Sequence, residues 1–158
     1  MNEREQFIRV WEREFPTTLK VLKAFPAAKS DFKPHERSRS ARELAFVFSI
    51  EESVMQMVFK GDVPMGGKFP EAPAKYDDVV AAYEKAHHAN AALLAGMRDA
   101  DFQQIRTFGK LEKVPMIQIL WFLLMDGVHH RGQFAVYLRI AGAKVPSIYG
   151  PSGDEPWT

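Results

Sequence analysis

Apolar residues recur at intervals of three and four positions in four long segments of the chain. This spacing places them on one face of an α-helix, and it predicts helices near residues 3–25, 38–59, 75–97 and 115–141. No segment shows a convincing strand pattern. Four amphipathic helices of this length can bury their apolar faces against one another as a four-helix bundle. The sequence therefore predicts an all-α protein in which residues 1–158 form one domain.

The segments between the predicted helices carry helix-breaking and helix-capping residues. Ser38 and Ser40 are both candidates for the N-cap of the second helix, and Glu43 follows Ser40 at the spacing of a capping box. Pro16 is expected to kink the first helix. Three glycines and three prolines in Gly61–Ala74 predict a long loop. The polar stretch "RDADFQQIRTFGKLEK" is interpreted as an irregular connection. Because the connections differ in length, the order of the helices in the bundle stays open.

Composition and charge narrow the classes of function. Lys and Arg number 21 against 20 Asp and Glu, so no broad basic surface for nucleic acid is expected. The absence of cysteine excludes disulfides, thiolate ligands and a cysteine nucleophile. The N-terminal residues are charged where a signal peptide would be apolar. The apolar run Val114–Met125 is shorter than the about 20 residues of a membrane span. We therefore expect a soluble cytoplasmic protein that binds neither nucleic acid nor membrane.

Polar residues interrupt the apolar fourth helix in the stretch "DGVHHRGQFAVYLR". Asp126, His130, Gln133 and Tyr137 are spaced by four, three and four residues, so they share one face of the helix. An acid and a histidine at this spacing can bind one metal ion, and bundle interiors commonly contain such sites. The alternative is a hydrogen-bonded pair without metal. His129 points about 100° away from this face and is not expected to join the site.

Two stretches of the sequence resemble the DinB-like (YfiT-like) family of metalloenzymes. They are "HHRGQFAVYLRIAGAKVPSIYGPSGDE" and "KPHERSRSARELAFVFSIEE", and the resemblance covers most of the chain. It implies a four-helix bundle with one long crossover, frequent homodimers, and a divalent metal, usually zinc or nickel, held by three side chains. Relatives in this family include thiol S-transferases and a thiol-dependent isomerase, whereas many members have no assigned reaction.

The ligands that the resemblance implies are only partly present in this sequence. His130 matches the family histidine before Arg-Gly-Gln, and Asp126 stands where many members have a second histidine. The histidine of the second helix is replaced by Val47, which cannot bind metal. Glu51, one turn further on, is the ionisable member of an apolar stripe, and a lone buried carboxylate needs a partner. It could complete the metal site, pair with His130 or Arg131 without metal, or lie exposed beside Glu52.

Several other residues are weighed as site members. His87 lies on the inner face of the third helix and is expected to be a satisfied core histidine rather than part of the site. Arg131 and Arg139 could bind an anionic substrate, although such arginines more often pair with a carboxylate or with carbonyl groups. Gln133 is expected to hydrogen-bond a ligand of the site rather than to react.

Two functions remain open from the sequence. The first is a metal-dependent enzyme, a hydrolase or thiol transferase acting on a small molecule, with Asp126, His130 and Glu51 as metal ligands. The second is a non-catalytic bundle that has lost its metal and binds a small ligand or acts as a structural dimer. A homodimer is expected in either case, since apolar residues lie on more than one side of the second helix, namely Phe46, Ile50 and Met57.

Overall fold

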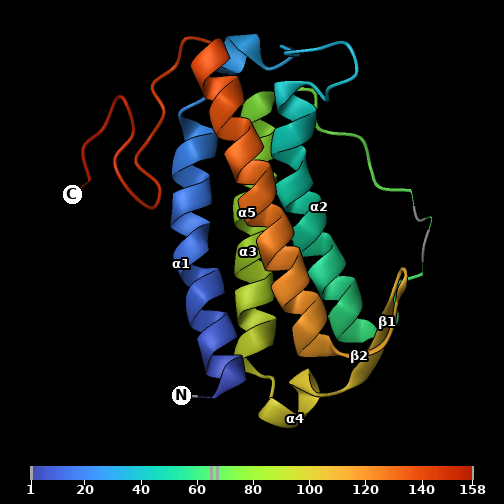
Figure 1. Ribbon diagram of the computed structural model, residues 1–158. Coiled ribbons are helices and arrows are strands. Elements are labelled where there is room, and N and C mark those ends of the chain that lie inside the picture. The colour runs from blue at the N-terminus through green and yellow to red at the C-terminus, as the bar shows by residue number, and fades with distance from the viewer. Residues whose placement is uncertain (1, 65, 67, 158) are drawn as a thin grey trace.

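Four long helices form the body of the protein in the computed structural model, which describes residues 2–64, 66 and 68–157. They are α1 (Glu3–Lys23), α2 (Ala41–Lys60), α3 (Tyr76–Ala95) and α5 (Met116–Ile140). α2 packs against α3 and α5, and α1 packs against the same two helices (Figure 1). The predicted four-helix bundle is confirmed, and each helix end lies close to its predicted position. Within the described ranges, no helix is long and apolar enough to cross a membrane.

The helices do not simply alternate in direction along the chain. α1 and α5 run one way and α2 and α3 run the other way (Figure 1). α3 begins at the end of the bundle where α2 begins, so the connection between them crosses back along the bundle. The order of the helices, which the sequence leaves open, is therefore set by one long crossover between α2 and α3.

The connection between α3 and α5 contains regular structure that the sequence did not predict. A short helix, α4 (Asp99–Phe102), is followed by the antiparallel strands β1 (Ile105–Phe108) and β2 (Leu111–Pro115). Gly109 adopts a φ of 58° between the strands, a left-handed conformation that glycine takes without strain. The interpretation of this stretch as irregular is wrong, because its strands are too short to show a clear alternation. The fold class is unaffected by one two-stranded hairpin.

Local sequence signals explain where the helices begin and end. The Ser40 side chain accepts a hydrogen bond from the Glu43 backbone N–H, and the Glu43 carboxylate accepts one from the Ser40 N–H. This is a capping box, so Ser40 is the N-cap of α2. Pro16 lies inside α1 without ending it. Gly142 follows α5 with a φ of 77°, as is common for the glycine after a helix end.

The core consists of two apolar clusters separated by a polar layer. One cluster surrounds the start of α2 and the end of α5, and the other surrounds the opposite ends of these helices. Between them lie seven polar side chains, which we call the polar layer: Glu14, Thr18, Glu51, Glu52, His87, Asn90 and Arg131. Buried polar groups need hydrogen-bond partners, so this layer restricts how the helices can pack.

The capping box gives a test of the start of α2. Ser40→Ala removes the side-chain acceptor of the Glu43 N–H and should lower the free energy of unfolding by about 1 kcal/mol. Urea denaturation would measure it. Ser38→Ala is the matched control, because Ser38 lies outside α2 and its side chain does not cap the helix. Equal effects of the two substitutions would contradict this assignment.

Candidate metal centre

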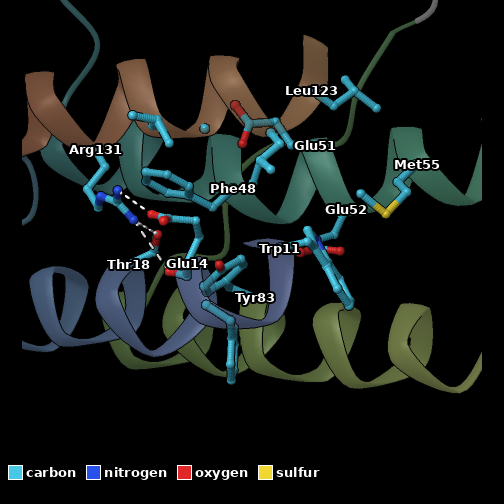
Figure 2. A pocket seen from close by; sticks show the side chains of 14 residues that line it. Trp11, Glu14, Thr18, Phe48, Glu51, Glu52, Met55, Tyr83, Leu123 and Arg131 are labelled. Carbon is cyan, nitrogen blue, oxygen red and sulfur yellow. Dashed lines mark hydrogen bonds and ion pairs between the residues drawn. The ribbon is translucent and has the colours of Figure 1, made fainter. Parts of the chain in front are cut away.

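Glu51, Asp126 and His130 converge in the middle of the bundle, where α2 faces α5. His130 Nδ1 lies 2.8 Å from Glu51 Oε1 and 3.7 Å from Asp126 Oδ2. One potential ligand atom from each of the three side chains lies within 4.8 Å of the other two. Figure 2 shows Glu51 extending from α2 toward α5. Two carboxylates and one imidazole therefore form a donor set of the kind that binds divalent ions.

Burial of Glu51 removes one of the three alternatives left by the sequence. Its side chain is 14% exposed, so the alternative in which α2 turns Glu51 out to solvent is wrong. Val47 is packed into an apolar cluster one turn away. Glu52, which that alternative also placed outside, is buried and accepts hydrogen bonds from Asn90. α2 thus directs two successive carboxylates into the bundle, Glu51 toward α5 and Glu52 toward α3.

Gly127 is a member of the site that the sequence analysis missed. A Cβ atom at this position would lie 3.0 Å from Glu51 Oε2, which is tighter than nearly all real contacts. The missing side chain therefore lets the Glu51 carboxylate lie directly against α5. A signal was present, since glycine inside a helix costs about 1 kcal/mol relative to alanine and usually has a packing reason.

The short contact between Glu51 and His130 changes the acidity of both groups. Burial raises the pKa of Glu51 to about 7, and the hydrogen bond from His130 only partly opposes this. The hydrogen bond to Glu51 raises the pKa of His130 above its usual value, and burial opposes this rise. The nearby charge of Asp126 acts in the same direction on both. Without a bound ion, Glu51 is therefore easier to protonate, and His130 harder to deprotonate, than the same groups in water.

The polar stripe on α5 is not directed at the centre along its whole length. Gln133 is exposed and lies 2.8 Å from His129, so the expectation that it supports a ligand is wrong. Three residues along a helix correspond to a turn of about 300°, which leaves Gln133 about 60° from His130. Tyr137 faces inward again and donates a hydrogen bond to the Arg39 carbonyl (3.0 Å). Only Asp126 and His130 from the stripe reach the centre.

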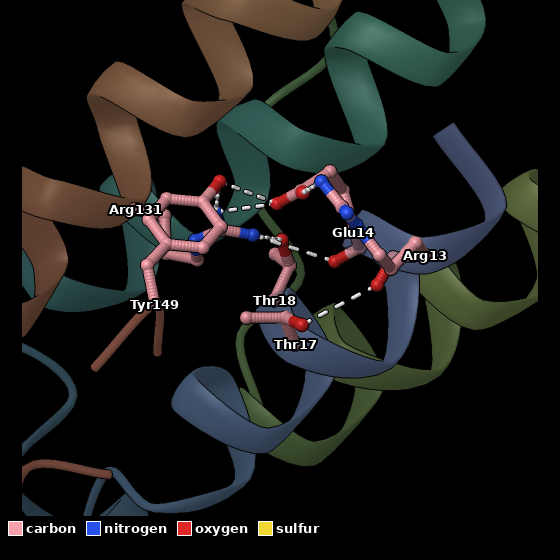
Figure 3. Close-up of polar contacts among 6 residues, drawn as sticks. All are labelled: Arg13, Glu14, Thr17, Thr18, Arg131 and Tyr149. Atoms are coloured by element: carbon pink, nitrogen blue, oxygen red, sulfur yellow. Dashed lines mark hydrogen bonds and ion pairs between the residues drawn. The ribbon is translucent and has the colours of Figure 1, made fainter. Parts of the chain in front are cut away.

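Arg131, beside His130 in the sequence, belongs to a separate buried network (Figure 3). It is 1% exposed and donates hydrogen bonds to Glu14 Oε2 (2.6 Å), Thr18 Oγ1 (2.9 Å) and the Tyr149 hydroxyl. Burial opposes ionisation of Glu14, but hydrogen bonds from Tyr149 and Arg131 lower its pKa below the usual value. Arg139 is paired with Asp154 (2.7 Å). Arg131 and Arg139 therefore each pair with a carboxylate of the protein, which is one of the two alternatives, and neither is left to bind an anionic substrate.

His87 forms a third polar contact set away from the centre. Its ring stacks between Trp11 and Phe15, with centroids 3.9 and 3.8 Å away. Its two ring nitrogens lie 3.2 Å from Glu52 and 3.4 Å from Glu12. The expectation of a satisfied core histidine is confirmed.

A cavity of about 40 Å³ lies between the helices and is lined by Trp11, Glu51, Glu52 and Arg131, among others (Figure 2). It has room for only a few water molecules.

The fold and the centre together define a class of protein, a four-helix bundle with a candidate divalent-metal site between two helices. A DinB family model matches residues 1–157. The chain therefore belongs to the DinB family, in agreement with the resemblance of its second and fourth helices.

Individual relatives agree with this assignment. The chain is 28% identical over 160 residues to the uncharacterized protein YrdA of Bacillus subtilis (strain 168), covering 96% of this chain and 90% of YrdA. A DinB-like protein from Bacillus cereus ATCC 10987 has a TM-score of 0.79 at 24% identity, covering 92% of this chain and 97% of that chain. YfiT from Bacillus subtilis, described as a probable metal-dependent hydrolase with an unusual four-helix bundle topology, has a TM-score of 0.68 at 13% identity, covering 89% of each chain. These two structural likenesses establish the fold alone.

The Glu14–Arg131 pair gives a stability prediction. Arg131→Met keeps the apolar length of the side chain but removes the buried counter-ion of Glu14, which then keeps only the exposed Arg13 guanidinium at 3.5 Å and the Tyr149 hydroxyl as partners. The free energy of unfolding, measured in urea, should fall by about 3–5 kcal/mol. A Glu14→Met/Arg131→Met double variant buries neither charge and should lose much less. A loss below about 1 kcal/mol in the single variant, the value of an exposed pair, would contradict the inferred role of the network.

Proposed function

We propose that this protein is a metal-dependent enzyme that hydrolyses a small molecule, with a divalent ion held by Glu51, Asp126 and His130. One observation carries the proposal, namely that these three ligating side chains from two helices lie within 4.8 Å of one another. Three protein ligands are the usual number in a catalytic zinc site. Glu51 occupies the next turn of α2 after Val47, so it stands in for the histidine that the family resemblance places at that position.

The residues present fit a divalent ion in number, charge and access. Two ionised carboxylates balance the charge of such an ion, and the imidazole supplies a nitrogen ligand. Gly127 leaves the space that the Glu51 carboxylate occupies. The side chain of Asp126 is 39% exposed and that of His130 is 12% exposed, so the centre lies at the boundary between core and solvent. A small molecule can approach it from outside without opening the bundle.

The composition of the chain favours hydrolysis over thiol transfer. A divalent ion bound at such a centre lowers the pKa of a water or thiol in contact with it. The sequence holds no cysteine, so a thiol would have to arrive with a second substrate, whereas water needs no such partner. With an ion bound, Glu51 and His130 would be deprotonated and would give up the 2.8 Å hydrogen bond between them. Their role in hydrolysis would therefore be to hold the ion.

A second candidate function has its own supporting observation. The direct 2.8 Å contact between His130 Nδ1 and Glu51 Oε1 satisfies both buried groups without an ion. With Val47 in place of a ligand, the same residues could stabilise a non-catalytic bundle that binds a small ligand. Metal content separates this candidate from the enzyme.

Metal binding is the first prediction of the proposed function. Protein produced without a histidine tag should bind about one equivalent of zinc or nickel by elemental analysis, because three ligands converge. Glu51→Gln and His130→Ala should each lose this metal. His129→Ala is the matched control, since His129 is exposed and contacts Gln133 instead. Absence of metal in the unmodified protein would leave the non-catalytic bundle, and metal that survives Glu51→Gln would exclude Glu51 as a ligand.

The acidity of the ligands gives a second prediction. Glu51 and His130 must lose their protons to bind an ion, and the pKa of Glu51 is raised to about 7 while that of His130 is also raised. Metal affinity should therefore be high above pH 7 and should fall by at least about tenfold per pH unit below it, one factor of ten for each proton displaced. Competition with a chelating dye from pH 8 to 6 would measure this. A constant affinity across that range would contradict it.

A further inference from the structure

Two arginines lie beside the candidate centre in the segment that leads into α2. Arg37 and Arg39 are both exposed and line a recess of about 610 Å³. The opposite wall of this recess is formed by α5, through Gln133, Val136 and Tyr137. The recess is large enough for part of a small molecule, and its charged side chains are both positive.

The charges of these two arginines are not neutralised within the described part of the chain. None of the carboxylates described there lies within ion-pair distance of either guanidinium, whereas Arg42, Arg131 and Arg139 each pair with an acid. A second recess, which Arg37 and Arg39 also line, contains the acids Glu43 and Glu71. The Glu43 carboxylate accepts a hydrogen bond from the Ser40 N–H at 2.6 Å. The two guanidinium groups are thus available to an anion.

The backbone under Arg39 is held in place by the bundle. The Tyr137 hydroxyl donates a hydrogen bond to the Arg39 carbonyl, and the next residue, Ser40, caps α2. Fixing the backbone reduces the conformational entropy that is lost when the side chain binds a ligand. Arg39 therefore has a more defined position than an arginine in a free loop.

The recess lies close to the candidate centre along α5, since its wall includes Gln133. Gln133 follows His130 by three residues, about 4.5 Å along the helix axis. The charge of Arg39 is near enough to act on His130. A molecule with one group at the candidate centre can therefore extend along α5 into the recess that Arg39 lines.

We propose that Arg37 and Arg39 form a subsite for an anionic group, a carboxylate or a phosphate, of the molecule that reacts at the Glu51–Asp126–His130 centre. Guanidinium groups suit both anions because their planar N–H donors match the oxygens in pairs. The subsite deepens the proposed function, on which the identity of the reacting centre rests. It specifies an anionic substrate whose negative group lies in the recess lined by Arg37 and Arg39 while another part of the molecule reaches the centre.

The test uses two simple anions and metal-free protein. Succinate and inorganic phosphate are titrated separately into the full chain in the presence of a chelator, and binding is followed by NMR. At least one anion should bind, moving the amide signals of Ser38–Ser40 and Gln133 and the ring signals of His130. The anion that binds more tightly identifies the group as a carboxylate or a phosphate.

Arginine variants show whether the recess is responsible. An Arg37→Gln/Arg39→Gln variant should bind the preferred anion at least about tenfold more weakly, because charge-assisted hydrogen bonds are lost. Arg9→Gln is the matched control, since Arg9 is also exposed and lies on α1; it should leave the affinity unchanged. Binding of neither anion, unchanged affinity in the double variant, or His130 ring signals that do not move would each overturn the subsite.

The metal-free protein keeps this test apart from the proposed function. If the unmodified protein takes up no metal but binds an anion through Arg37 and Arg39, the enzyme proposal fails and the anion subsite stands. If metal binds and the anions do not, the reverse holds.

Discussion

Arg131 is fully buried, and its charge has to be neutralised inside the bundle, which permits α5 only one rotation against α1. The guanidinium reaches Glu14 and Thr18 on α1, and Tyr149 of the C-terminal segment closes the network. His130 is the preceding residue, so it points about 100° away from Arg131, toward α2. The Arg131–Glu14 ion pair thereby fixes the direction in which His130, a candidate metal ligand, points. Rotating α5 to move His130 would leave a charge buried without a partner, at a cost of several kcal/mol.

α2 is oriented in the same way by a neighbouring pair of carboxylates. Glu52 is anchored on α3 by Asn90 and His87, at 2.5 and 3.2 Å. Glu51 precedes it and therefore faces α5, where Gly127 provides the room for its carboxylate. On both helices, one residue of an adjacent polar pair fixes the rotation and the other forms the centre. The polar layer thus links the stability of the fold to the geometry of the site.

The family resemblance places a histidine where this chain has Val47, and the proposed centre uses the carboxylate of Glu51 one turn later instead. Two carboxylates and one imidazole bring two negative charges toward a divalent ion, whereas imidazoles bring none. The carboxylate at position 51 is also the group whose pKa is raised by burial. Under the proposed function, protons would therefore compete with the metal ion for Glu51 near neutral pH.

The sequence by itself determined the helices and the family, and it named Asp126, His130 and Glu51 as candidate ligands, with the orientation of Glu51 left open. Helical spacing of apolar residues gave the positions of α1, α2, α3 and α5, and the pair Asp126 and His130 followed from a spacing of four on one helix. These features are local, because they depend on residues within one or two turns. The β1–β2 hairpin was not predicted, because its strands are too short to show an alternating pattern.

The tertiary structure decided what depends on contacts between distant segments. It showed that Glu51 faces His130, that Glu52 and Arg131 are buried with partners, and that Gly127 makes space. Those facts depend on how each helix is rotated against its neighbours, and rotation is fixed by contacts between buried polar groups that are 38 to 117 residues apart in sequence.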